Sequence, residues 1–85
     1  MTHCAWTLHR IDPTINAKRW YVVIVQPTLF DAHAVVCLWG RLGTDGERCR
    51  IIPATSRAEA EAQARKIVEQ KVKKGYVDFR NPKHP

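Results

Sequence analysis

Six consecutive residues, Trp20 to Val25, are all aromatic or β-branched, and this run restricts the chain to folds that contain a β-sheet. Such residues lose side-chain freedom in a helix but pack well on a pleated surface. A strand that is apolar on both sides is typical of the interior of a sheet. We therefore predict a central strand over residues 20–25, with both faces shielded and with Pro27 as its end.

Two further segments have strand character. Residues 4–10 alternate, with Cys4, Trp6 and Leu8 on one side, which is the pattern of a strand covered on one face. Residues 34–39 repeat the apolar composition of the central strand. These segments predict two more strands of the same sheet.

A hairpin is predicted after the third strand. Residues 43–46 read Gly-Thr-Asp-Gly, which tolerates the backbone of a tight reversal. On the return strand Arg48, Arg50 and Ile52 share one side, because side chains alternate along a strand. Since two of these three residues are arginines, we predict that this side faces solvent.

One helix is predicted over residues 57–74. Ser56 and Glu59 have the spacing of a capping box, and Gly75 stands where a left-handed residue ends a helix. The apolar stripe of this helix also includes Lys71, and its other members are Ala60, Ala64, Ile67 and Val68. Beyond the helix, residues 76–79 are expected to extend the sheet or to pack on the helix.

The chain is expected to be a small soluble protein of the cytoplasm. Its 85 residues leave no room for a second domain, and no apolar run approaches the roughly 20 residues that span a bilayer. The first residues lack the pattern of a secretory signal. Cys4, Cys37 and Cys49 are odd in number and contain no CxxC pair, so we expect reduced core thiols.

Enzymatic and metal-binding functions find no support in the sequence. There is no GxSxG, no HExxH and no identifiable carboxylate pair in an apolar setting. His33 and Cys37 would stand roughly 13 Å apart on one strand, too far to share a zinc ion. We expect a non-enzymatic protein with no metal, cofactor or small-molecule substrate.

Basic charge is concentrated in the second half of the chain. The formal net charge is +6, of which residues 1–40 contribute +1 and residues 41–85 contribute +5. Lysines at the end of the predicted helix are explained by its dipole, but Arg41, Arg48 and Arg50 are not. A positive surface of this kind favours polyanionic partners.

The tripeptide Trp39-Gly40-Arg41 departs from ordinary strand composition. Trp39 and Arg41 would project from the same face about 7 Å apart, and Gly40 would leave the opposite face open to close approach. An exposed aromatic ring beside arginines can contact phosphates, sugars or bases. The alternative is a core tryptophan beside a surface arginine.

The segment 39–43, followed by Gly46 and a basic strand, resembles the signature of the WGR domain. Segments upstream and downstream resemble short bacterial proteins made of this domain alone (residues 8–13, 16, 19–21, 26–30, 60, 71, 75 and 76). The resemblance covers about residues 5–79. It implies an α+β fold in which a twisted antiparallel sheet of four to five strands packs against the one helix, with residues 80–85 as a flexible tail of a single domain, 1–85.

The resemblance also implies a function. The WGR module of eukaryotic poly(ADP-ribose) polymerases helps to bind DNA ends and relays contacts between domains. By this resemblance Trp39 would face the DNA and Arg41 would be a contact residue. The transferase activity is not implied, because this chain has no catalytic domain of that kind.

These observations leave two hypotheses for the Trp39 face, besides the alternative that Trp39 and Lys71 are packing residues. In the first, the chain is a nucleic-acid-binding module, with DNA as the expected ligand and RNA as an alternative. In the second, the same face docks on a partner protein, since Trp and Arg are also common at interface hot spots. The candidate binding residues are Trp39, Gly40, Arg41, Arg48, Arg50 and Lys71.

Overall fold

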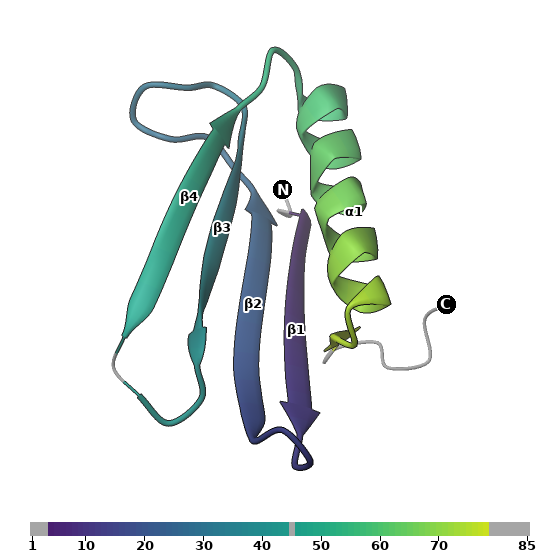
Figure 1. Ribbon diagram of the computed structural model, residues 1–85. Coiled ribbons are helices and arrows are strands. Elements are labelled where there is room, and N and C mark those ends of the chain that lie inside the picture. Colours follow the sequence, from purple (N-terminus) through teal and green to yellow (C-terminus); the bar gives the residue numbers. More distant parts are fainter. Residues whose placement is uncertain (1–3, 45, 79–85) are drawn as a thin grey trace.

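The computed structural model describes residues 4–44 and 46–78, which form one five-stranded sheet and one helix (Figure 1). The elements in chain order are β1 (Cys4–Asp12), β2 (Ala17–Val25), β3 (Ala34–Arg41), β4 (Glu47–Pro53), α1 (Arg57–Lys73) and β5 (Val77–Asp78). Neighbouring strands are antiparallel, in the order β4-β3-β2-β1-β5. The predicted α+β class is confirmed, and β2 is the central strand. The predictions for Phe79 and for residues 80–85 lie outside the described residues.

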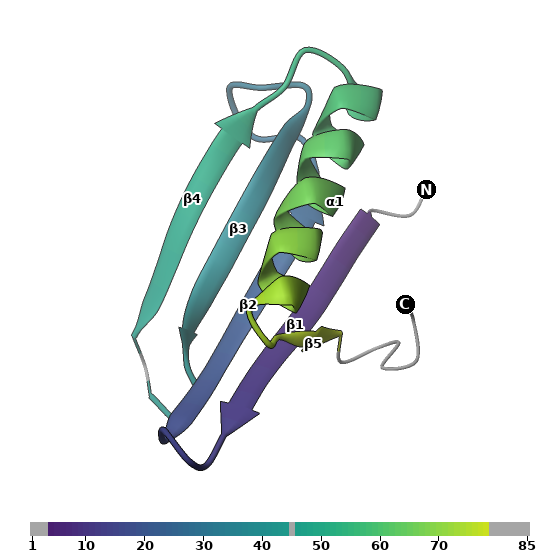
Figure 2. The same cartoon turned by 45° about the vertical axis from the view of Figure 1, so that its right-hand side comes forward.

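Helix α1 lies across one face of the sheet and closes the core against β2 and β3 (Figure 2). Ala60 and Ala64 are fully buried, because their small side chains let the helix backbone approach the strands closely. Ile67 and Val68 are half-buried and pack against the same core. The predicted apolar stripe of the helix is therefore confirmed. Opposite it, the sheet contributes Leu8, Tyr21, Val23, Val25, Val35 and Cys37.

The opposite face of the sheet is not covered by any helix or strand of the described residues. Trp20, Val22 and Ile24 on this side of β2 are half-buried and not buried. The prediction that both faces of residues 20–25 are shielded is therefore wrong for this face. The apolar run reflects a strand with two neighbours, which cover its flanks without covering its second face.

The side of β4 that carries the arginines contacts the core at one end and solvent at the other. Ile52 is half-buried against the core, whereas Arg48 and Arg50 are exposed. The prediction of a solvent-facing side therefore holds for the two arginines and is wrong for Ile52. The difference arises because α1 covers this face only at the end of β4 from which the helix begins.

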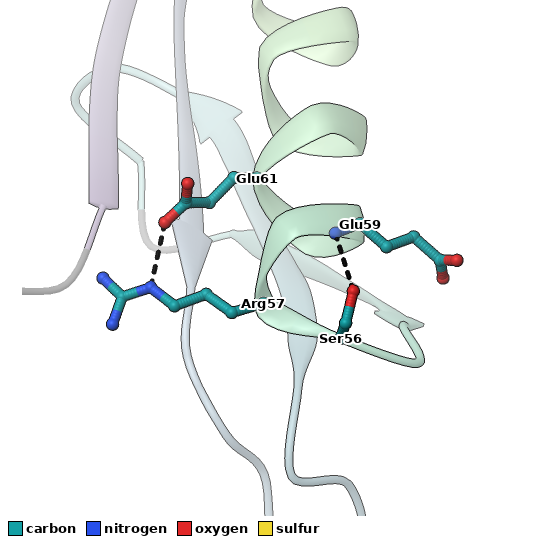
Figure 3. A network of polar contacts seen from close by, with 4 residues as sticks. All are labelled: Ser56, Arg57, Glu59 and Glu61. Atoms are coloured by element: carbon teal, nitrogen blue, oxygen red, sulfur yellow. Dashed lines mark hydrogen bonds and ion pairs between the residues drawn. The ribbon is translucent and has the colours of Figure 1, made fainter.

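The start of α1 is capped by side chains (Figure 3). Ser56 Oγ accepts a 3.1 Å hydrogen bond from the Glu59 amide. The Glu59 carboxylate accepts a 3.1 Å hydrogen bond from the Thr55 amide and a 3.0 Å hydrogen bond from the Thr55 hydroxyl. In a capping box the glutamate would accept from the amide of the N-cap residue Ser56, so the donor here is one residue earlier. Arg57 and Glu61 form an ion pair of 2.9 Å one turn apart.

The end of α1 turns the chain back into the sheet. Gly75 has φ 102°, and its amide donates to the Val72 carbonyl at 3.0 Å. The Tyr76 amide donates to the Lys71 carbonyl at 3.1 Å, which completes the Schellman arrangement expected at this glycine. The reversal brings the Tyr76 ring into the core and allows β5 to pair with β1.

Two of the cysteines are found in different environments. Cys37 is a free thiol in the core, as predicted, but Cys49 is exposed on the edge strand β4, so the prediction of a core thiol is wrong there. The side chain of Cys4 lies outside the described part of the structure. No helix of the described chain is long and apolar enough to cross a bilayer.

Candidate nucleic-acid interface

Two central strands of the sheet extend beyond the helix that covers it (Figure 2). Figure 2 shows that β1 and β2 continue past the last turn of α1. On the helix side of this uncovered region lies an open groove of about 630 Å³. It is lined by residues of β2, β3, β4 and the end of α1 (Arg19, Trp20, Tyr21, Trp39, Gly40, Arg41, Arg48, Arg50, Lys71 and Tyr76).

Strand register explains why aromatic and basic residues meet here. In an antiparallel sheet, directly opposite residues share a face. One row across the sheet contains Tyr21, Trp39 and Arg48, and the next row outward contains Arg19 and Arg41. The groove therefore follows from two adjacent rows of the sheet, one aromatic and one basic.

Trp39 both packs on the core and lines the groove. Its ring stacks on Tyr21 with centroids 5.6 Å apart and an interplanar angle of 14°. Tyr21 in turn meets Tyr76 edge-on at 6.2 Å and 74°. Trp39 is half-buried, so the indole is anchored by the core and still contributes to the groove surface. The packing interpretation of this residue therefore applies, and its place in the groove lining is compatible with the binding interpretation.

Lys71 reaches the groove from the last turn of α1. Its ammonium lies 4.5 Å from the centroid of the Tyr21 ring and 5.6 Å from that of Tyr76, which is cation–π geometry. Partial burial, together with the nearby charge of Lys74, lowers the pKa of the Lys71 ammonium. Lys71 therefore combines the predicted packing role with a place on the groove surface.

The cations of the groove have no acidic partners in the described chain. Among residues 4–44 and 46–78, the one side-chain ion pair joins Arg57 to Glu61. This pair lies on the first turns of the helix, outside the groove lining. Arg41 Nη2 donates to the backbone carbonyl of Asn16 at 3.4 Å, which orients its guanidinium and leaves its charge uncompensated. Arg19 stands directly opposite Arg41, a like-charge pairing that disfavours the sheet and that an anion would relieve.

Gly40 makes room for two neighbours on the far side of the sheet. A Cβ placed on it would lie 2.5 Å from the Gly46 carbonyl oxygen and 3.1 Å from two atoms of the Trp20 indole. The predicted close approach at Gly40 is confirmed, and both a backbone and a side chain take part. Its contribution to the groove itself is limited to its backbone.

All six residues proposed from the sequence line this one groove (Trp39, Gly40, Arg41, Arg48, Arg50 and Lys71). Sequence reasoning missed the other four residues of the lining, Arg19, Trp20, Tyr21 and Tyr76. Alternation puts Arg19 and Tyr21 on one side of β2, but only the register between β2 and β3 places that side beside Trp39 and Arg41. The position of Tyr76 depends on the reversal after α1.

Comparison with known proteins identifies the family. The profile of the WGR domain matches residues 5–83 of the chain. The chain belongs to the WGR domain family. WGR domains are often linked to nucleic-acid binding and more generally to interaction with nucleic acids or proteins.

One relative of this WGR domain is the uncharacterized protein y4dW of Sinorhizobium fredii (strain NBRC 101917 / NGR234). The two are 30% identical over 69 residues, which cover 81% of this chain and 33% of the relative. The chain thus spans about a third of the length of that protein. No solved structure matches this WGR domain.

The described part of the WGR domain offers no metal site, since no three His, Cys, Asp or Glu residues among 4–44 and 46–78 are grouped to hold an ion. The side chains that line the groove are aromatic rings and cations. These can stack on flat or sugar surfaces and pair with negative oxygens.

The burial of Tyr21 makes the folding stability of this WGR domain sensitive to alkaline pH. Burial, followed by a hydrogen bond with Cys37, raises the pKa of the Tyr21 hydroxyl above that of an exposed tyrosine. The pKa of the Cys37 thiol is also raised by burial. Because unfolded Tyr21 ionises first, the unfolded state binds fewer protons above about pH 10, and stability falls as pH rises.

We expect the substitution Tyr21→Phe to remove the part of the alkaline loss of stability that comes from ionisation of Tyr21. The loss attributable to Tyr21 should reach about 1 kcal/mol by about pH 11. Urea unfolding of wild type and variant at several pH values between 8 and 11 measures it. Parallel stability curves for the two proteins would contradict the assignment.

Proposed function

We propose that this chain is a non-enzymatic nucleic-acid-binding module whose ligand is DNA. The observation that carries the proposal is the groove in which five cations without acidic partners among the described residues surround a stacked aromatic pair (Arg19, Arg41, Arg48, Arg50 and Lys71, with Tyr21 and Trp39). Phosphate oxygens would pair with the cations, and a sugar or base would lie on the exposed part of Trp39.

The charge of the groove favours a polyanion over a protein partner. A protein interface at this place would bury several unpaired cations, which is costly unless the partner supplies a carboxylate for each. A phosphate backbone supplies regularly spaced negative charge and releases its own counterions. Base-specific recognition is not part of the proposal, because the groove holds cations and rings rather than an element shaped for a duplex groove.

A salt titration tests the proposal. If all five cations meet phosphates, the slope of log affinity against log salt should be about −4.5 for duplex DNA and about −3.5 for a single strand. Fluorescence anisotropy with labelled duplex, nicked and single-stranded DNA at several salt concentrations measures these slopes. An absence of binding at low salt, or a slope near zero, would refute the proposal.

A matched variant separates the groove from net charge. Arg48→Gln removes one groove cation, and Arg65→Gln removes one exposed cation of α1 outside the groove lining. We expect the first to make the duplex slope less steep by about 0.9 and the second to leave it nearly unchanged. A partner captured from cell extract that survives nuclease treatment and is lost with Arg48→Gln would instead support docking on a protein.

A further inference from the structure

An exposed apolar loop lies at the end of the sheet opposite the basic groove. Leu29 and Phe30, in the connection from β2 to β3, are each 90% exposed. Arg19 at the start of β2 and Arg41 at the end of β3 belong to the other end of the same strands (Figure 1). Adjacent large apolar side chains at this exposure are characteristic of an interaction site.

The backbone of this loop is fixed without help from the two apolar side chains. The Thr28 amide donates to the Asp31 carbonyl at 2.8 Å, and the Thr28 hydroxyl donates to the Asp31 carboxylate at 3.0 Å. The Asp31 amide donates back to Thr28 Oγ1 at 3.0 Å. Leu29 and Phe30 are therefore presented by a preorganised turn, which lowers the entropy cost of binding.

The charge of the segment identifies the kind of surface it fits. No lysine or arginine occurs between Arg19 and Arg41, and the loop itself contains Asp31. Nucleic acids and anionic lipid surfaces attract segments rich in Lys and Arg. An apolar protein surface remains as the complementary partner.

The chain itself carries such a surface. A second groove, of about 520 Å³, lies beside the C-terminal half of α1. Its apolar lining consists of Trp6, Val68 and Val72, and Val72 is 48% exposed. Its charged lining has two cations, Arg65 and Lys73, and two anions, Glu69 and Asp78. Because these charges balance, the groove does not repel a loop that carries one negative charge.

We propose that Leu29 and Phe30 of one copy of this chain insert into the Trp6–Val68–Val72 groove of a second copy. None of the described residues covers Leu29 and Phe30 or fills the second groove, whose volume of about 520 Å³ exceeds that of two such side chains. The cations of the basic groove do not line this second groove, so the charge of the chain does not oppose the contact there. The contact joins two different surfaces of the chain. Two copies that exchange loops would form a reciprocal dimer, and copies that pass the loop on to the next would form a longer assembly.

Self-association in the absence of nucleic acid tests the proposal independently of DNA binding. Sedimentation velocity should show an average mass that rises with concentration up to the millimolar range. Phe30→Ser and Val72→Glu should each weaken the association about tenfold or more. The control Ile15→Ser replaces another exposed apolar residue, 60% exposed in the β1–β2 turn, and should leave association unchanged.

Mixing the two defective variants identifies the contact. The Phe30→Ser protein keeps an intact groove and the Val72→Glu protein keeps an intact loop, so one contact per pair can form and the mixture should associate more than either variant alone. A mixture that stays monomeric would overturn the proposal, as would a wild type that is monomeric throughout. If Val72→Glu lowers thermal stability while the wild type stays monomeric, the groove has a role within a single copy of the chain, and the proposal is again wrong.

Discussion

Replacing both Arg19 and Arg41 with glutamine is expected to weaken binding to duplex DNA roughly 60-fold at about 0.1 M salt. The two residues stand directly opposite each other at the outer row of the groove, within reach of the same stretch of phosphate backbone. Each lost phosphate contact removes about 0.9 from the salt slope, which corresponds to about eightfold at this salt concentration. Fluorescence anisotropy over a range of salt concentrations measures both quantities.

The control for this variant changes the same net charge elsewhere. Arg65→Gln with Lys66→Gln removes two exposed cations of α1 and should reduce affinity only slightly. The Arg19 and Arg41 variant should also be at least as stable as wild type, because it removes a like-charge pairing across two strands. Equal losses of affinity in the two double variants would show that binding depends on total charge and not on the groove.

Gly40→Ala is expected to destabilise the fold by about 3 kcal/mol. The added Cβ would meet the Gly46 carbonyl oxygen at 2.5 Å, so the backbone between β3 and β4 must move, and the Trp20 ring at 3.1 Å limits the alternative direction. For a domain of this size the loss corresponds to a melting temperature lower by roughly 12 °C or more. Thermal unfolding followed by circular dichroism measures it.

Gly43→Ala is the matched comparison. Gly43 has φ 81° but nothing within 4 Å of the added atom, so only backbone strain of about 1 kcal/mol is expected. The difference between the two variants isolates the crowding at Gly40. A Gly40→Ala protein as stable as Gly43→Ala would show that the hairpin adjusts freely and that the motif glycine has no spatial role.

The sheet and the helix could be predicted from local patterns. Residues 20–25 specify a strand at every position, and Ser56 and Gly75 mark the two ends of the helix within about one residue. The second face of β2 was predicted wrongly, because an apolar run does not say whether its cover comes from another layer or from neighbouring strands.

The candidate groove was predicted in part. Trp39 and Arg41 follow from alternation within one strand, and Lys71 from the helix stripe. Arg19 and Tyr21 depend on the register between β2 and β3, which the separate segments do not reveal. Tyr76 depends on the reversal that begins at Gly75, where one glycine decides the direction of the chain.

The reversal at Gly75 also links ligand affinity to the docking of α1. Lys71 and Tyr76 occupy their places around Tyr21 only when the helix is seated on the sheet, so an isolated sheet would hold an incomplete groove. A ligand that contacts both parts binds the docked state more tightly and shifts the population toward it, by about 2.7 kcal/mol at a concentration about 100 times its dissociation constant. Amide hydrogen exchange in α1 should therefore slow when the groove is filled.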